Sequence, residues 1–172
     1  MFNFFFPPVQ LKLLAEVQRD GQALARGSPA LRSDAAVAHA AAGQHCSALA
    51  HAGEALLDDG VFMLPELKRC GLALQYCSPR LQDDLDMAPH AVRQDWRALR
   101  FCSPRLRADP DVALLGLRQT WRAVELAAPS LFGEKAAMLA ALAENGGLLA
   151  RCSRALRHDR EVVLAALGQD WR

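Results

Sequence analysis

The sequence has almost none of the β-branched residues from which sheets are built. Its 172 residues include no isoleucine and one threonine, and nine valines stand against 32 alanines and 28 leucines. Valine, isoleucine and threonine suit a pleated strand, whereas alanine and leucine are among the best helix formers. We therefore predict an all-α protein, and the length is sufficient for one domain with its own core.

The chain also lacks an excess of charge of either sign. Twenty basic residues, 17 of them arginine, are balanced by 19 acidic residues, which leaves a net charge of +1. This balance provides no general attraction to nucleic acid or to an anionic membrane. Hydrophobic residues make up 52% of the chain, which excludes a fully disordered protein.

Signals for export or membrane insertion are missing as well. The longest stretch without Asp, Glu, Lys or Arg, residues 35–53, contains three histidines, and a membrane-spanning helix needs about 20 mostly apolar residues. The apolar start of the chain has no basic residue and is cut short by two prolines, unlike a signal peptide. Five cysteines, an odd number, do not indicate a disulfide framework. We expect a cytoplasmic protein, with export by a route that has no readable signal as the open alternative.

What the sequence does contain is a repeat of 25 residues without a single insertion. Three columns of the repeat carry, in turn, an acidic residue, a leucine and a mostly apolar residue. They are Asp34, Asp59, Asp84, Asp109, Glu134 and Asp159; Leu31, Leu56, Leu81, Leu106, Leu131 and Leu156; and Val17, Ala42, Leu67, Val92, Leu117, Leu142 and Leu167. We assign units 10–34, 35–59, 60–84, 85–109, 110–134 and 135–159, and a half-unit 160–172. The prediction is an α-solenoid of six and a half repeats, preceded by residues 1–9.

Each unit is expected to form two short helices and one further helical turn. The acid that ends a unit is placed to cap the next helix, and Ser-Pro pairs such as Ser78-Pro79 cap the last turn. Asn-Gly and Asp-Gly pairs suggest a turn between the two helices. The turn column holds glycine in some units but Trp96, Trp121 and Cys46 in others, which a left-handed turn would disfavour. Two helices are favoured, and one longer bent helix in the tryptophan units is the alternative.

Two of the units resemble a known tandem-repeat family. The pattern Ala-Leu-x-x-Cys-Ser-Pro-x-Leu-x-x-Asp occurs from Ala73 to Asp84 and again from Ala98 to Asp109, and residues 159–167 also fit. This pattern is similar to that of a domain of unknown function found in multiple copies in bacterial and protist proteins. The resemblance implies a helical-repeat architecture and implies neither an activity nor catalytic residues.

The cysteines and histidines give little sign of chemistry. Cys77, Cys102 and Cys152 share a column with Gly27, Ala52 and Ala127, which indicates a small buried position. His45, Cys46 and His51 lack the i,i+4 spacing of helical zinc ligands. No phosphate-binding loop, nucleophile elbow or pair of carboxylates is present. We expect neither an enzyme nor a bound metal or cofactor.

The best candidate for a contact surface is the tryptophan column with the arginines around it, because both residue types are frequent in interaction hot spots. The candidate residues are Trp96, Arg97, Arg100, Trp121, Arg122, Arg93 and Arg118. Our first hypothesis is a non-enzymatic scaffold that binds a protein partner. The alternative is a nucleic-acid-binding repeat in which bases stack on these side chains, although the column after the tryptophans is not a plausible base code.

The two ends of a solenoid need a cover over their apolar faces. Residues 1–9, with Phe2, Phe4, Phe5 and Phe6, are predicted to form an N-terminal cap. The half-unit 160–172 is either itself the cap of repeat 6 or the surface of an end-to-end homodimer. The alanine-rich second unit supplies the least apolar volume, so we expect it to be the least stable.

Overall fold

The computed structural model describes residues 8–168. The predicted aromatic cap, residues 1–9, falls mostly outside this range, and so does Trp171 of the half-unit, so neither is tested by the fold. No strand occurs between residues 8 and 168, and the all-α prediction is confirmed.

The helices come in groups of three that follow the 25-residue spacing. The first helices are α1 (Pro8–Val17), α3 (Ala35–Gln44), α5 (Gly60–Arg69), α7 (Ala88–Gln94), α9 (Pro110–Leu117), α10 (Lys135–Glu144) and α12 (Arg160–Leu167). The second helices are η1 (Gly21–Arg26), η2 (Cys46–His51), η3 (Gly71–Tyr76), η4 (Trp96–Phe101), η5 (Trp121–Glu125) and η7 (Gly146–Arg151). The third are α2 (Pro29–Arg32), α4 (Glu54–Leu57), α6 (Pro79–Gln82), α8 (Pro104–Arg107), η6 (Pro129–Gly133) and α11 (Arg154–Arg157).

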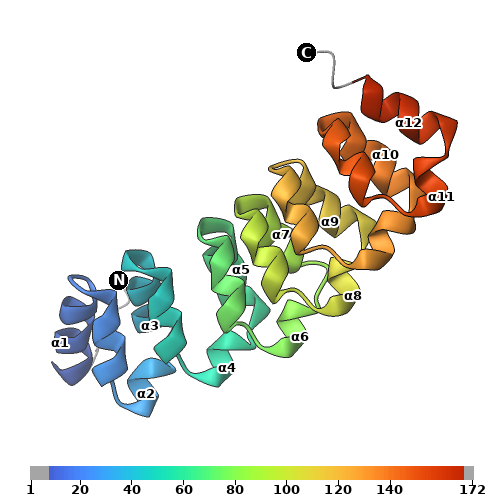
Figure 1. Cartoon of the computed structure of the whole chain (residues 1–172). Coiled ribbons are helices and arrows are strands. Elements are labelled where there is room, and N and C mark those ends of the chain that lie inside the picture. The colour runs from blue at the N-terminus through green and yellow to red at the C-terminus, as the bar shows by residue number, and fades with distance from the viewer. Residues whose placement is uncertain (1–7, 169–172) are drawn as a thin grey trace.

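The groups stack into an elongated row with α1 at one end and α12 at the other (Figure 1). Each first helix contacts the first helix of the next group, and the second helices from η1 to η5 contact one another in the same order. The third helices lie along one edge of the row. Since neighbours in space are neighbours in sequence, this is the arrangement of an α-solenoid.

Side-chain caps start most of the helices where the sequence predicts. Asp34, Asp59, Asp109 and Asp159 accept backbone N–H bonds at the start of first helices, and Ser28, Ser78, Ser103 and Ser153 do so at the start of third helices. Two acids differ from this pattern. Glu134 makes no side-chain cap bond, and Asp84 caps an irregular turn that precedes α7. Pro89 explains the late start of α7, because proline has no N–H to donate and suits only the first turn of a helix.

The second helix of every group is a separate 3-10 helix, so the prediction of two helices holds and the bent-helix alternative is wrong. One extended residue separates it from the first helix, as at Asp95, where φ is −150° and ψ is 115°. None of residues 8–168 has a positive φ, so tryptophan is tolerated at this position without strain. The Asp-Gly and Asn-Gly pairs are not left-handed turns, since Asp20 and Asn145 cap η1 and η7.

Glycine in the turn column has a different cause, which is the close approach of the next repeat. A Cβ atom on Gly21 would lie 2.5 Å from the carbonyl oxygen of Ala41 in α3, and the same collision would occur between Gly71 and Ala91. The amide of Gly71 also donates to Gln94 Oε1 at 2.6 Å, and the amide of Trp96 donates to Gln119 Oε1 at 3.1 Å. The second helix of one repeat is therefore fastened to the first helix of the next.

A backbone hydrogen bond also joins each third helix to the following repeat. The donors and acceptors lie 21 residues apart at every junction. The pairs are Gly53 N to Arg32 O, Ser78 N to Leu57 O, Ser103 N to Gln82 O, Ala128 N to Arg107 O and Ser153 N to Phe132 O, at 2.8–3.1 Å. These bonds satisfy backbone groups that short helices leave open at their ends.

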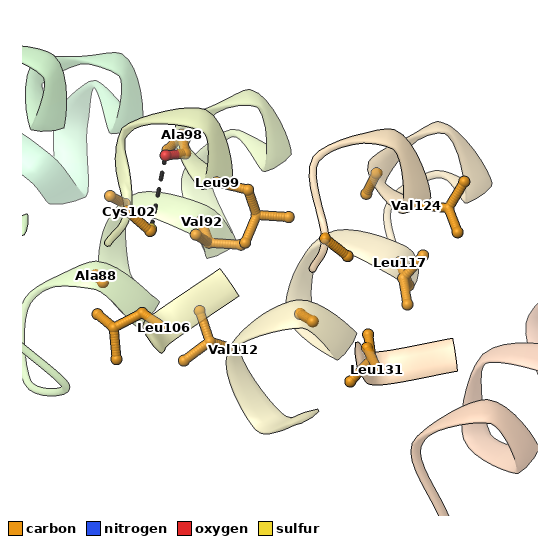
Figure 2. Close-up of a cluster of buried hydrophobic side chains, with 14 of the residues drawn as sticks. Ala88, Val92, Ala98, Leu99, Cys102, Leu106, Val112, Leu117, Val124 and Leu131 are labelled. Atoms are coloured by element: carbon orange, nitrogen blue, oxygen red, sulfur yellow. Dashed lines mark hydrogen bonds between the residues drawn. The ribbon is translucent and has the colours of Figure 1, made fainter. Parts of the chain in front are cut away.

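The core runs along the row between the helices, and the leucine column contributes to it as predicted. Leu106 is fully buried beside Val112 of the next repeat (Figure 2), and Leu81 and Leu131 are equally enclosed. In the first two repeats, however, Leu31 and Leu56 are only half-buried. The buried residues separate into two clusters that meet in repeat 2, with Ala52 and Phe62 packed against both. This division is in line with a weak second repeat, whose stability stays a prediction.

The end of the row at α12 buries one face only. Val162 and Ala166 are enclosed, whereas Leu164 and Leu167 are 56% and 47% exposed. The inner face of α12 packs on α10 and η7 of repeat 6. The end-to-end dimer through the outer face stays a prediction.

We predict that Gly71→Ala destabilises the protein by about 1–3 kcal/mol, because the added methyl would force η3 and α7 apart. Gly43→Ala is the matched control: nothing lies within 4 Å of the added atom, and alanine within α3 gains up to about 1 kcal/mol of helix propensity. Urea denaturation of both variants measures the difference. Equal midpoints for the two variants would show that the close approach is unimportant.

Leu106→Ala is expected to cost about 2–5 kcal/mol, through lost burial and the cavity it leaves. Cys102→Ala should cost about 1 kcal/mol or less, since alanine already occupies this column at Ala127. Chemical denaturation provides both values. An unmoved midpoint for Leu106→Ala would contradict the register of the repeat.

Candidate functional site

The two predicted tryptophans lie in successive second helices but differ in exposure. Trp96 is half-buried and packs against the core, whereas Trp121 is 48% exposed. Arg122 places its guanidinium 5.9 Å from the centre of the Trp121 ring, and Arg100 lies 6.0 Å from the Phe101 ring. Trp121 is thus the aromatic side chain of this pair that is available to a partner.

Arg97 is already paired within its own repeat. Its guanidinium donates to both carboxylate oxygens of Asp95, the residue that caps η4, at 2.9–3.2 Å. Hydrogen bonds from Arg97 offset the effect of burial and lower the pKa of Asp95. The charge of Arg97 is therefore largely compensated before any ligand binds.

Arg93 and Arg118 belong to another layer of the molecule than the tryptophans. They line a groove of about 480 Å³ between α7 and α9, together with Asp109 and Asp111. The apolar part of this groove includes Leu114 and the half-exposed Leu85. The seven predicted residues thus divide into a set on the first helices and a set on the second helices.

Trp121 forms one wall of a separate hollow between η5 and η7, with a volume of about 350 Å³. Val124, Leu148 and Ala150 provide apolar surface, and charges of both signs come from Glu125 and Arg151. The hollow is suited to an apolar side chain flanked by polar groups.

The cysteine column is buried, as the sequence predicts. The thiols of Cys77, Cys102 and Cys152 each donate to the backbone carbonyl four residues earlier, and Figure 2 shows this bond from Cys102 to Ala98. Burial raises the pKa of Cys77 and Cys102 to about 12, so these thiols stay protonated and unreactive. Between residues 8 and 168 no group of three or more His, Cys, Asp or Glu is arranged to hold a metal.

A polar cluster that the sequence analysis missed occupies the junction of repeats 2 and 3. Glu66 of α5 is completely buried, with Arg69 donating to one carboxylate oxygen. Nδ1 of His39 in α3 lies 2.5 Å from the other oxygen, as an ion-pair contact rather than an aligned hydrogen bond. The signal was present in the sequence, because this column otherwise contains only small residues: Ala41, Ala91, Gly116, Ala141 and Ala166.

Two half-buried thiols lie at the same junction. Cys46 begins η2 and Cys70 separates α5 from η3, and their side chains are within hydrogen-bonding contact. Burial, this hydrogen bond and the neighbouring Cys70 raise the pKa of Cys46 to about 11. Their spacing of 24 residues, one less than the repeat, hid this pair from a search along columns.

The Ser-Pro-Arg segments have a second function beside capping. Ser78 and Arg80 both donate to the carboxylate of Asp58 in the preceding repeat, and Ser103 and Arg105 do the same to Asp83. Each arginine also reaches the backbone carbonyl of that aspartate. The serine hydroxyl, and then the arginine, lower the pKa of Asp58 and of Asp83.

Comparison with known proteins agrees with this part of the chain. Residues 62–107, about a quarter of the sequence, match the model of a domain of unknown function, DUF4116. The match runs from α5 to the end of α8 and contains both Ser-Pro-Arg segments, so the resemblance to such a domain is confirmed there. No curated protein and no solved structure matches the sequence. No helix within residues 8–168 is long and apolar enough to cross a membrane.

The aspartate bridges make a pH-dependent contribution that one variant isolates. Because the folded-state pKa of Asp83 is lowered, its bridge stabilises the fold above the unfolded pKa of about 4 and is lost as the pH falls further. Asp83→Ala should therefore lower the melting temperature at pH 7 and have little effect near pH 2, where wild type has also lost the bridge. The next repeat has Ala108 at this position, so alanine is compatible with the backbone. An equal difference at both pH values would contradict a charged bridge.

Proposed function

We propose that this chain is a non-enzymatic helical-repeat scaffold that binds a segment of another protein across repeats 4 to 6. The observation that carries the proposal is the hollow beside Trp121, in which an exposed indole, apolar side chains and both signs of charge come together. Exposed tryptophan next to apolar surface is typical of the hot spots of protein interfaces. The free cysteines are compatible with the cytoplasmic location expected from the sequence.

The charges around the site favour a protein segment over nucleic acid. Asp109 and Asp111 line the same groove as Arg93 and Arg118, and Arg97 is paired with Asp95. A polyphosphate chain would be repelled by these carboxylates, whereas a peptide that carries both signs of charge would be complementary. The occupant we expect presents an apolar side chain to Trp121, with an acidic neighbour facing Arg151 and a basic one facing Glu125.

The test compares capture of proteins from the producing cells by wild type and by two variants. Trp121→Ala should reduce the captured partner by about tenfold or more, since a central aromatic contact contributes at least about 1.4 kcal/mol. Val61→Ala is the control, because Val61 is 86% exposed on α5, away from the hollow. Both variants should melt like the wild type, so that a loss of capture reports binding.

Nucleic acid binding is measured in parallel, with mixed-sequence single-stranded RNA and DNA as probes. We expect no binding that depends on Trp121 at physiological salt. Trp121-dependent binding of either probe, or loss of capture after nuclease treatment, would favour the nucleic-acid reading. Capture that Trp121→Ala leaves unchanged would reject the proposed site.

A further inference from the structure

The junction of repeats 2 and 3 combines features that no other junction has. The opposing positions are glycine and aspartate at Gly71 and Asp95, and tryptophan and threonine at Trp96 and Thr120. Only in repeats 2 and 3 does a thiol stand at both, on Cys46 and Cys70. Since residues at these two positions meet across every junction, as the contacts of Gly71 with Ala91 and Gln94 illustrate, the two thiols are brought together by the stacking itself.

Neither thiol has the structural role that its position usually has. Asp20, Asp95, Thr120 and Asn145 cap the second helix from the position of Cys70, whereas Cys70 makes no side-chain cap bond. Cys46 replaces a glycine that would allow the closest approach of the repeats. Both side chains are half-buried, in contrast to the enclosed thiols of Cys77, Cys102 and Cys152. Small oxidants therefore have access to this pair and not to the others.

We propose that Cys46 and Cys70 form a reversible disulfide that links repeat 2 covalently to repeat 3, with glutathione disulfide or a similar small disulfide as the oxidant. The sulfur of Cys70, once deprotonated, attacks the oxidant to give a mixed disulfide and one released thiolate. The sulfur of Cys46, after losing its proton to solvent, then attacks Cys70 Sγ and displaces the second thiolate. Two protein thiols are oxidised and one small disulfide is reduced to two thiols.

The order of the two attacks follows from the surroundings. Arg69 lies beside Cys46, and burial together with Cys70 keeps the pKa of Cys46 near 11, so Cys46 retains its proton while Cys70 reacts first. Tyr76 is close to both thiols, and its own pKa is raised by burial and by their charge. Cys46 is thus the resolving thiol, held in contact with the sulfur that it has to attack.

The consequence of the bond lies in where it is placed. The buried residues of the protein divide into two clusters at this point, and α3 stands visibly apart from α5 in Figure 1. The buried Glu66 occupies the same interface, where other junctions have alanine or glycine. A covalent link closes a loop of 25 residues around the junction and restrains the N-terminal repeats in the unfolded state.

The experiment uses the full chain, reduced and then equilibrated with mixtures of reduced and oxidised glutathione. Intact mass should fall by two hydrogen atoms without a stable glutathione adduct, and peptide mapping should join the peptides of Cys46 and Cys70. The effective concentration of the pair should fall at least about tenfold in urea, because the fold holds the thiols together. Oxidation should raise the melting temperature by roughly 5–10 °C.

Three variants make the result specific. Cys46→Ser should trap the glutathione adduct on Cys70, and Cys70→Ser should abolish the cross-link, while Cys102→Ala, the matched control, should oxidise like wild type. Stable adducts on both cysteines of the wild type, a cross-link to a different cysteine, or an effective concentration unchanged by urea would overturn the proposal. Oxidation without a change in melting temperature would reject its structural consequence.

Discussion

Everything in this structure depends on the contact between one repeat and the next. Helices of four to ten residues are not stable alone in water, and each one here has its apolar face covered by a neighbouring repeat. The contact is specific as well as apolar. A backbone hydrogen bond joins the third helices at five successive junctions, and glutamine side chains bind the amide of the preceding turn at Gly71 and Trp96. Stacking thus fixes the register, while burial supplies most of the free energy.

This dependence explains which parts of the fold could be predicted from the sequence. Columns of a repeat report its buried and capping positions directly, so the leucine column, the cysteine column and most capping acids were identifiable. What lay between the columns was not. The 3-10 form of the second helix follows from tertiary contacts, and the late start of α7 follows from a single proline, Pro89. Glycine in the turn column was misread, because a close approach of two backbones leaves the same sequence mark as a positive φ.

The candidate sites divide along the same line. Trp121 and its arginines stood out because their column holds side chains of very different size on an exposed surface. Where a partner would contact them depends on η5, η7 and α9 being placed by the stack, which no sequence pattern specifies. Glu66 and the pair Cys46–Cys70 escaped notice for the opposite reason. They interact across an interface, at offsets of 27 and 24 residues, and a comparison of positions 25 apart does not register such contacts.

Substitutions at these two kinds of position have different effects on a linear array. A change on the outer surface alters what one repeat binds and leaves its neighbours alone. A change at an interface alters the coupling between all repeats on one side and all repeats on the other, because coupling passes only through nearest neighbours. The buried Glu66, with its partners His39 and Arg69, stands at such an interface, and burial of a charge makes that interface costly if any partner is lost. Repeats 1 and 2 are therefore the part of the array whose attachment to the rest is most open to adjustment.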